Sequence, residues 1–395
     1  MVFNFIISSF VKMIKYNQNV LHLPNDVGGN PYMISKKMNE VGISSSCMVL
    51  NKNQFYKENL YDFVIYNYND CFFVREIKRF ICLSYVLFYK VIFLNFGSTL
   101  FTPFPEFRFK HESGFTYLKL YIYSIYRFLM FELELFLLKF LKRKVIVQYQ
   151  GSDCRLKIFC INNFIYNRSS FDTYTKHDHE IDTFKTKQIQ RIKRIANNIY
   201  ALNPDLLYTL PKSAQFLPYS HICLKEWKNF NYFTRRDNSL NFIHCPTDRD
   251  GKGTSIIVDA VKLINDKYND IIKFNLVENT PRINAKSIFL NSDILIDQLH
   301  AGWYGGLAVE CMALNKPVIS YLRESDFQFL PKEMAHELPI INANPSNLYH
   351  VLEKLIKLNA SQIVNIGSRS RKFVEKWHDP NKVVRFLSND NGIKI

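Results

Sequence analysis

Short apolar runs alternate with helical patterns through the first half of the chain. The runs that predict strands are residues 19–23, 47–50, 62–66, 91–96, 144–149 and 198–202. A helix is predicted from residue 30, because Ile34, Met38 and Val41 recur on one face and Gly42 ends the pattern. Alternation of this kind is typical of a parallel, doubly wound sheet.

A second series of the same kind begins after residues 203–238, where the alternation is lost. Thr254 is predicted to cap a helix with an apolar stripe from Ile256 to Ile264. Further strands are predicted at 241–245, 272–277, 293–298 and 317–322, and residues 361–387 are helical with a break at 378–380. The sequence therefore predicts two α/β domains with a boundary near 220–238. Two such sheets facing one another would form a ligand cleft at the carboxyl ends of their strands.

The composition is that of a globular protein. The 395 residues are enough for two domains, and 47% apolar with 22% charged residues excludes wholesale disorder. The eight cysteines contain no CxxC pair and lie mostly in apolar runs. They are therefore interpreted as reduced core residues of a cytosolic protein, and not as a disulfide or zinc framework.

The formal net charge of +16 predicts a partner of negative charge. Nucleic acid, anionic lipid and phosphorylated small molecules all meet this condition. The basic residues are spread along the chain, and no DNA- or RNA-binding motif accompanies them. We therefore expect a lipid or a phosphorylated small molecule, and no nucleic acid.

Two stretches approach the hydrophobicity of a membrane span. Residues 81–97 are interrupted by Lys90 and residues 118–141 carry five charges, so no spanning helix is predicted. Residues 117–144 instead predict an aromatic-rich amphipathic helix with a basic end. This helix either docks on the inner membrane surface or is a core helix with a solvated end. The apolar residues 1–10 lack a basic leader and a cleavage site, so no signal peptide is expected.

Two loops of the first half could contact a ligand. Gly28 and Gly29 follow the first strand, where paired glycines allow close approach and the next helix offers amides to an anion. A tight strand–helix turn explains the pair equally well. Asp153 lies in the Gly-Ser-Asp turn after the strand at 144–149. It could face sugar hydroxyls or simply stabilise its own turn.

A third loop, at residues 246–254 (PTDRDGKGT), has the chemistry of a diphosphate site. Arg249 and Lys252 flank glycines just before a helix, and a diphosphate needs both cations and backbone N–H donors. Surface pairing of Arg249 with Asp250 is the alternative. The sequence GxxxxGK[ST] does not occur before this helix, which excludes the P-loop of ATPases.

A fourth loop combines glycines, a helix start and one carboxylate. Gly305 and Gly306 begin a helix, and Glu310 lies about one turn in, roughly opposite its apolar face. A carboxylate there can accept hydrogen bonds from a ribose while the helix N-terminus binds phosphate. The alternative is a solvated glutamate that only interacts with the helix dipole.

With these motifs the chain resembles retaining nucleotide-sugar glycosyltransferases of the GT-B fold, a large group (family 4-like) of bacterial polysaccharide enzymes. Residues 302–313 (GWYGGLAVECMA) and 316–319 (KPVI) resemble its donor-binding element, and 252–254 (KGT) its diphosphate motif. Residues 203–207 with 216–218 resemble the end of its acceptor domain. The His-Asp-Pro sequence of 378–380 resembles the break before its last helix.

The chain departs from the family pattern at three places. The family has two glutamates separated by seven residues, and Gly302 stands at the first position while Glu310 keeps the second. The family arginine lies five residues before the lysine, where this chain has Thr247, and Arg249 is expected to substitute. The histidine that often precedes the Gly-Ser-Asp turn is Gln150 here.

The resemblance implies an α/β, GT-B architecture of two Rossmann-like doubly wound domains facing a central cleft. The acceptor domain would be 1–220, the nucleotide-sugar domain 239–372, and 373–395 a helix returning to the first domain. The implied activity is sugar transfer, with retention and without a metal or other cofactor, from a nucleotide-diphosphate sugar to a glycan or lipid-linked oligosaccharide. The implied setting is envelope polysaccharide synthesis (lipopolysaccharide, O-antigen or capsule) in the cytoplasm, at the inner membrane surface.

The resemblance also implies the site residues. Arg249 and Lys252 would stabilise the leaving diphosphate, and Asp153 would border the acceptor. The residues expected to bind the donor are Gly28, Gly29, Lys252, Gly253, Gln298, Gly302, Tyr304, Gly305, Gly306, Leu307 and Glu310.

Three other functions were weighed. A nucleotide-sugar 2-epimerase would need catalytic carboxylates and a histidine in matching places, and the sequence shows no such set. A catalytically degenerate GT-B protein that binds nucleotide sugars or serves in assembly is favoured by Gly302 and Gln150. A nucleic-acid binder would show salt-sensitive retention of DNA or RNA.

Overall fold

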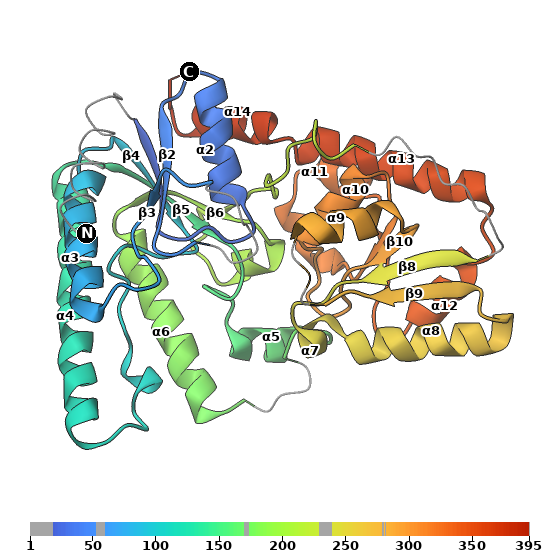
Figure 1. Cartoon of the computed structure of the whole chain (residues 1–395), viewed down its shortest axis with the longest axis horizontal. Helices are drawn as coiled ribbons and strands as arrows, with labels where there is room; N and C mark the ends of the chain where they lie inside the picture. The colour runs from blue at the N-terminus through green and yellow to red at the C-terminus, as the bar shows by residue number, and fades with distance from the viewer. Residues whose placement is uncertain are drawn as a thin grey trace. The chain divides into compact units, whose positions relative to one another are not determined.

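The chain forms two compact units (Figure 1). The computed structural model describes residues 19–52, 60–169, 174–228, 239–278, 280 and 282–394, so the apolar residues 1–10 lie outside it. Unit 1 comprises the described residues of Met1–Ile158, Thr173–Leu217 and Val384–Ile395, and unit 2 those of Phe159–Asp172 and Pro218–Val383. One segment of the predicted domain 1–220 thus belongs to unit 2, and the segment 373–395 is divided at residue 384.

Unit 1 is built on seven parallel strands in the order β3-β2-β1-β4-β5-β6-β7. The order reverses between β1 and β4, so the loops after these two strands lie at the switch point of the sheet, where α/β proteins bind ligands. The strands are β1 (Val20–Leu23), β2 (Ser45–Val49), β3 (Phe63–Val64), β4 (Val91–Asn95), β5 (Lys144–Tyr149), β6 (Ala196–Ala201) and β7 (Gln215–Phe216).

Helices cover both faces of this sheet. Leu21 and Leu94 point to the face of α3, α4 and α6, where they share one core with Leu83, Phe131 and Ile192. Helices α2 and α14 cover the other face (Figure 1). The helices are α2 (Asn30–Glu40), α3 (Phe72–Val86), η1 (Glu106–Arg108), α4 (Gly114–Phe140), α6 (Lys176–Lys193), η2 (Pro204–Tyr208) and α14 (Pro380–Asp390), with α5 (Lys157–Asn163) at the junction of the two units.

Unit 2 is built on five parallel strands in the order β12-β11-β10-β8-β9. The order reverses between β8 and β10, which places a second switch point there. The strands are β8 (Leu240–His244), β9 (Ile272–Leu276), β10 (Ile294–Ile296), β11 (Val318–Ser320) and β12 (Ile341–Asn342). The helices are α7 (Arg249–Lys252), α8 (Thr254–Tyr268), α9 (Arg282–Leu290), α10 (Gly306–Ala313), η3 (Glu324–Phe329), α11 (Lys332–Glu337), α12 (Leu348–Leu355) and α13 (Ala360–Trp377).

Two local predictions have different outcomes. The predicted break at 378–380 is confirmed, because α13 ends at Trp377 and α14 begins at Pro380. The prediction that Thr254 caps α8 is wrong. The cap residue is Gly253, in the left-handed region with φ +77°, and the Thr254 hydroxyl is instead 2.9 Å from Nε2 of His244.

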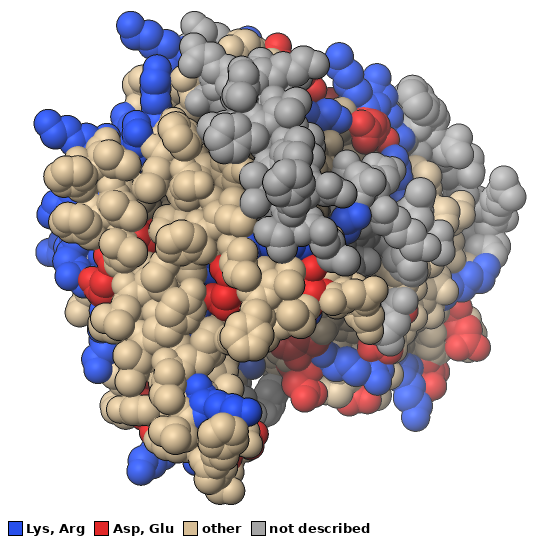
Figure 2. All heavy atoms as spheres, turned by 60° about the vertical axis from the view of Figure 1, so that its left-hand side comes forward, with Lys and Arg blue, Asp and Glu red and all other residues tan. Residues whose placement is uncertain are grey.

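The predicted amphipathic helix is α4, which lies beside α3 on one side of unit 1 (Figure 1). Figure 2 brings this side forward and shows a broad expanse of uncharged side chains, with Lys and Arg along its left edge and a few Asp and Glu among them. None of the helices in the described ranges combines the length and the apolar character that a membrane span requires.

Candidate functional site

The predicted donor residues of unit 2 gather at its switch point. Lys252 and Gly253 lie in the loop region after β8, and residues 298–306 follow β10. Strands β8 and β10 are neighbours in the sheet, and both loops leave from carboxyl ends of parallel strands. Residues 45 positions apart in the chain are therefore in direct contact here.

Asp297 joins these two loops. Its carboxylate is fully buried, accepts a hydrogen bond from Nζ of Lys252 at 2.8 Å, and accepts a second from the amide of Gly305 at 2.7 Å. Lysine carries three donors, so this contact leaves two for another acceptor. Sequence reasoning missed Asp297, although an acid directly after a short apolar strand was a usable signal.

The Lys252 loop is held on both sides. Asp248 begins α7 by accepting a hydrogen bond from the Gly251 amide at 3.1 Å, and its carboxylate pairs with Arg168 at 2.7 Å. Gly253 ends α7 with a positive φ, and a Cβ there would also approach His300 to 3.2 Å. Both conditions favour glycine at the residue that follows the lysine.

Arg249 does not join the Lys252–Asp297 contact. Its side chain is 58% exposed, and its Nε lies 3.4 Å from Oε1 of Glu278. An exposed ion pair of this kind contributes at most about 1 kcal/mol. Arg249 is thus paired on the surface, although with Glu278 and not with the neighbouring Asp250.

Helix α10 starts with amides that face no side-chain cap among the described residues. Gly305 is the extended residue before the helix, and its own amide is already engaged by Asp297. The expectation that the Gly305 amide binds phosphate therefore needs correction. The amides of Gly306 and Leu307, at the positive end of the helix dipole, are the ones placed to bind an anion.

Glu310 is buried, so the interpretation as a solvated helix residue is wrong. Its side chain is 10% exposed, and Oε1 lies 3.4 Å from Nε2 of His221. The same imidazole packs over the helix start, because a Cβ on Gly306 would approach His221 Cε1 to 3.2 Å. The Glu310 carboxylate, the His221 imidazole and the start of α10 thus lie next to one another. Sequence reasoning missed His221, which lies where the strand–helix pattern is lost.

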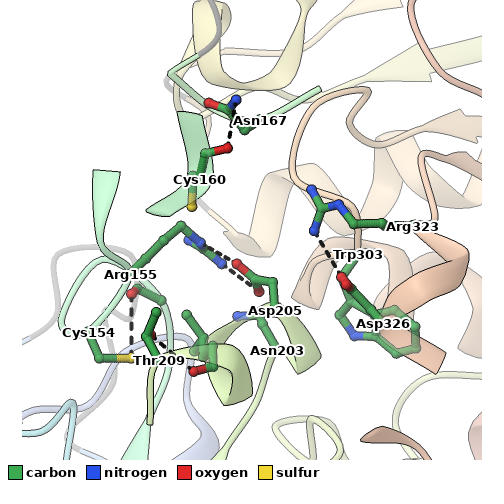
Figure 3. Close-up of polar contacts among 12 residues, drawn as sticks. Cys154, Arg155, Cys160, Asn167, Asn203, Asp205, Thr209, Trp303, Arg323 and Asp326 are labelled. Carbon is green, nitrogen blue, oxygen red and sulfur yellow. Dashed lines mark hydrogen bonds and ion pairs between the residues drawn. The ribbon is translucent and has the colours of Figure 1, made fainter. Parts of the chain in front are cut away.

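Gly302 stands where the family places a glutamate, and the space beside it is filled. Its φ is +79°, and a Cβ would lie 2.6 Å from the guanidinium carbon of Arg323. Arg323 is itself fixed by Asp326 at 2.9 Å (Figure 3). Its guanidinium also lies 3.4 Å from the centroid of the Phe164 ring. The Arg323 guanidinium therefore fills the space in which a side chain at position 302 would begin, and no sequence pattern indicated this.

Two further predicted residues, Gln298 and Tyr304, stabilise the turn before α10 through buried contacts. Gln298 donates a hydrogen bond through Nε2 to the carbonyl of Trp303. Tyr304 is fully buried, stacks on Trp303 with centroids 4.4 Å apart, and its hydroxyl lies 2.9 Å from Nε2 of His378. Burial lowers the pKa of His378 to about 3, so its ring is neutral and can accept this bond. The ring of Tyr304 thus lies in the core of unit 2.

In unit 1 the glycines after β1 adopt a turn that requires them. Gly28 and Gly29 have φ of +70° and +80°, and Gly29 precedes α2 without a side-chain cap from any described residue. The start of α2 therefore lies at the switch point between β1 and β4. The two glycines suit both the tight turn and close approach of a ligand to the backbone.

Asp153 stabilises its own loop. Its carboxylate accepts hydrogen bonds from the amides of Gly151 at 2.6 Å and Gln150 at 3.1 Å. Burial raises the pKa of Asp153, against these backbone hydrogen bonds, which lower it. The adjoining Arg155 forms a bidentate pair with Asp205 at 2.6 and 3.1 Å (Figure 3), which ties the loop to the Asn-Pro-Asp motif.

Comparisons with known proteins identify the fold. No family model and no curated protein sequence matches the chain. Sucrose-phosphate synthase from Thermosynechococcus elongatus superposes with a TM-score of 0.55 at 12% identity, over 94% of this chain and 98% of that one. Anabaena HepE in complex with UDP-glucose gives 0.55 at 9% identity, over 95% and 99%. WaaG, a glycosyltransferase involved in lipopolysaccharide biosynthesis, gives 0.52 at 10%, over 93% and 99%. The chain has the GT-B fold, with two Rossmann-like units of the kind found in these glycosyltransferases.

Proposed function

We propose that the chain is a glycosyltransferase that moves a sugar from a nucleotide-diphosphate donor to a glycan or lipid-linked oligosaccharide. The observation that carries this proposal is the contact of Lys252 and Gly305 through Asp297, directly beside the uncapped start of α10. It gathers a cation and amide donors where a diphosphate would lie. HepE, which has the same fold, was solved with UDP-glucose.

The chemistry follows from the charge that develops on the leaving group. As the bond from the sugar to the diphosphate breaks, negative charge grows on the diphosphate oxygens. Lys252 and the amides of Gly306 and Leu307 would stabilise that charge without a metal ion, as preorganised donors do. Glu310 would accept hydrogen bonds from the ribose. Because the Arg249 pair with Glu278 is weak, Arg249 can turn to the diphosphate at little cost.

Unit 1 would supply the acceptor side. Gly28 and Gly29 would allow close approach of the donor sugar, and the loop that Asp153 stabilises would border the acceptor. We infer retention at the sugar from the family resemblance. We also propose envelope polysaccharide synthesis (lipopolysaccharide, O-antigen or capsule) as the setting, with the protein at the cytoplasmic face of the inner membrane.

The test is a panel of nucleotide sugars, screened by thermal shift and then by transfer to lipid-linked acceptors. We expect one donor to raise the melting temperature, because a ligand that binds only the folded state stabilises it. Lys252→Ala should lower turnover by about ten- to a hundredfold. Lys262→Ala, an exposed lysine on α8, is the matched control and should retain wild-type turnover. Equal turnover of Lys252→Ala and wild type would contradict the assigned role.

A second candidate is a catalytically degenerate protein that binds nucleotide sugars without transfer. The specific observation in its favour is Arg323, which fills the space beside Gly302. Under this alternative, a nucleotide sugar would bind and stabilise unit 2, but no donor and acceptor pair would give turnover. The same panel therefore separates the two candidates.

A further inference from the structure

Helices α3 and α4 form one layer on unit 1. The hydroxyl of Tyr123 on α4 donates to Oε1 of Glu76 on α3 at 3.0 Å, and the rings of Phe72 and Tyr123 meet edge to face at 4.9 Å. Helix α3 connects β3 to β4 and α4 connects β4 to β5, all parallel strands of one sheet, so the two helices run in the same direction (Figure 1). Helix α4 extends beyond α3, because Tyr123 lies nine residues after its start at Gly114.

The outer side of this layer is apolar. On α4, Phe115, Ile122, Leu129 and Phe136 are 70, 59, 60 and 60% exposed. Their spacing of seven residues places them in one stripe along a helix of 27 residues, about 40 Å long. Phe73 and Phe80 on α3 are 75 and 59% exposed. We call this surface the α3–α4 face, which Figure 2 shows as a broad uncharged area.

The carboxylates of α3 and α4 are buried or paired with arginines. Glu134 is buried, and its oxygens accept the amides of Leu100 and Phe101. Glu132 lies near Arg191 at 3.3 Å and Glu76 pairs with Arg79 at 2.5 Å. These three are the only acids of α3 and α4.

Cations remain along α4. Lys139 and Lys142 are exposed at its carboxyl end, and the Nζ of exposed Lys119 lies 4.2 Å from the centroid of the Phe115 ring. The face thus combines exposed aromatic rings with exposed lysines of α4. An apolar helix stripe with basic neighbours is the pattern of a helix that lies in the plane of an anionic membrane.

A basic hollow adjoins the amino-terminal part of α4. Its volume is about 680 Å³, and its lining is Phe104, Phe107, Arg108, His111 and His177. The guanidinium of Arg108 lies 5.8 Å from the centroid of Phe104, and Phe104 contacts Tyr123 of α4 at 5.6 Å. Of the described residues that line the hollow, none carries a carboxylate. Glu112 and Glu180 lie 3.6 and 3.9 Å from the two imidazoles, and Glu180 is also paired with Lys110.

We propose that the α3–α4 face lies on an anionic lipid bilayer and that the hollow receives the phosphate of a lipid headgroup. The hollow is joined to α4 by the contact of Phe104 with Tyr123, so a headgroup bound at Arg108 would lie beside the helix that carries the apolar stripe. A second copy of the chain is a poorer occupant, because it would bring the exposed lysines of α4 close to one another. The proposal rests on the proposed function only in that a lipid-linked acceptor would be delivered to this surface.

The test of the face is sedimentation of the whole chain with vesicles of phosphatidylcholine, with or without phosphatidylglycerol. We expect binding to the anionic vesicles only. Phe115→Gln, Phe136→Gln and Phe140→Gln together should weaken it at least tenfold, since these rings are 60–70% exposed and contribute little to folding. Ile165→Gln with Leu263→Gln, also exposed but in unit 2, is the matched control and should bind as wild type.

The test of the hollow uses vesicles that contain phosphatidic acid. Arg108→Ala should weaken their binding about fivefold, on the scale of one arginine at an anionic surface. Inorganic phosphate at matched ionic strength should displace the protein from these vesicles only weakly. If free phosphate competes as well as phosphatidic acid in vesicles does, the hollow is a site for free phosphate, and the lipid assignment is overturned.

Three results would overturn the docking proposal. They are equal vesicle binding of the triple variant and its control, equal binding of wild type to neutral and anionic vesicles, and loss of a wild-type dimer in the triple variant without any vesicle binding. Lys252→Ala keeps the tests separate. It should bind vesicles as wild type does, so vesicle binding without transfer by wild type would refute the proposed function and leave the docking surface intact.

Discussion

The two switch points of this protein differ in the charge of the residues beside them. In unit 2, Asp297 holds Lys252 and the Gly305 amide, so fixed charges surround the start of α10. In unit 1, the strands on either side of the switch point carry His22 and Asn95, which are buried and uncharged. Burial lowers the pKa of His22 to about 3, and its ring stacks on Phe93 at 4.4 Å.

The difference matches what each unit would bind. A leaving diphosphate develops negative charge, and fixed cations and amides stabilise it best in a site that excludes water. A glycan acceptor offers hydroxyl groups, for which neutral donors and acceptors suffice. Burying Lys252 and Asp297 costs desolvation energy that an apolar pair would avoid. We infer that unit 2 retains the pair for its ligand and not for stability.

The largest effect should come from breaking that pair. Asp297→Ala leaves the Lys252 ammonium, whose side chain is 12% exposed, and the Gly305 amide without their acceptor, so unit 2 should lose about 3 kcal/mol of unfolding free energy. Asn95→Ala in unit 1 removes only neutral bonds, such as that to the Leu23 carbonyl at 3.2 Å, and should cost about 1 kcal/mol.

These two losses can be measured separately. The three tryptophans, Trp227, Trp303 and Trp377, all lie in unit 2, so urea titration followed by their fluorescence reports on that unit. Hydrogen exchange of β4 and β5 reports on unit 1. Equal losses in the two variants would remove the distinction between the switch points.

The second effect concerns the residue that the family pattern lacks. Gly302→Glu introduces a side chain at φ +79° and 2.6 Å from the Arg323 guanidinium. Strain and overpacking together should cost about 2–4 kcal/mol in unit 2. Gly302→Glu with Arg323→Ala should recover the overpacking part, measured by the same fluorescence. A fully stable single variant would show that Arg323 can leave this position.

Much of the fold could be predicted because strand and helix periods are local. Strand β5 has the bounds that its apolar run indicated, whereas β7 and β12 contain two residues each and are too short for any period. Their place is set by pairing with β6 and β11, which no local pattern encodes.

The residues of the candidate site also separate into those with a local sequence signal and those defined by long-range contacts. Lys252 and Gly253 could be found because a cation and a glycine before a helix have a recognisable local chemistry. Asp297, His221 and Arg323 could not be given roles, because their partners lie far along the chain. The sequence also could not decide which side of α4 is exposed, because a helix rich in aromatic residues fits a core as well as a membrane surface.

A third effect tests whether the charged switch point binds the nucleotide. Glu310→Gln keeps the shape of the side chain but removes the charge beside His221. If Glu310 accepts ribose hydrogen bonds, nucleotide affinity should fall about tenfold or more, whereas the melting temperature should change little. Isothermal titration with the nucleoside diphosphate measures this, and equal affinity in both proteins would count against ribose contact.

The smallest effect is a difference in acid sensitivity between the units. Burial lowers the pKa of His244 to about 4 and of His378 to about 3, both in unit 2, whereas unit 1 has His22. These histidines are neutral in the folded state, so the unfolded chain takes up their protons first as the pH falls below about 6.5. Each should remove about 1.4 kcal/mol of stability per pH unit between pH 6.5 and its folded pKa.

Because burial also lowers the pKa of His300 in unit 2, this unit should lose stability at least twice as steeply as unit 1 between pH 6 and 4.5, by at least about 1.4 kcal/mol per pH unit more. Tryptophan fluorescence measures the slope of unit 2 in urea, and hydrogen exchange of β4 measures that of unit 1. His378→Asn should bring the two slopes closer, because it removes one of the three imidazoles of unit 2 whose pKa burial lowers, while an amide can still bond the Tyr219 carbonyl. If the slopes already agree in the wild type, buried histidines do not distinguish the units, and the contrast between them rests on Lys252 and Asp297 alone.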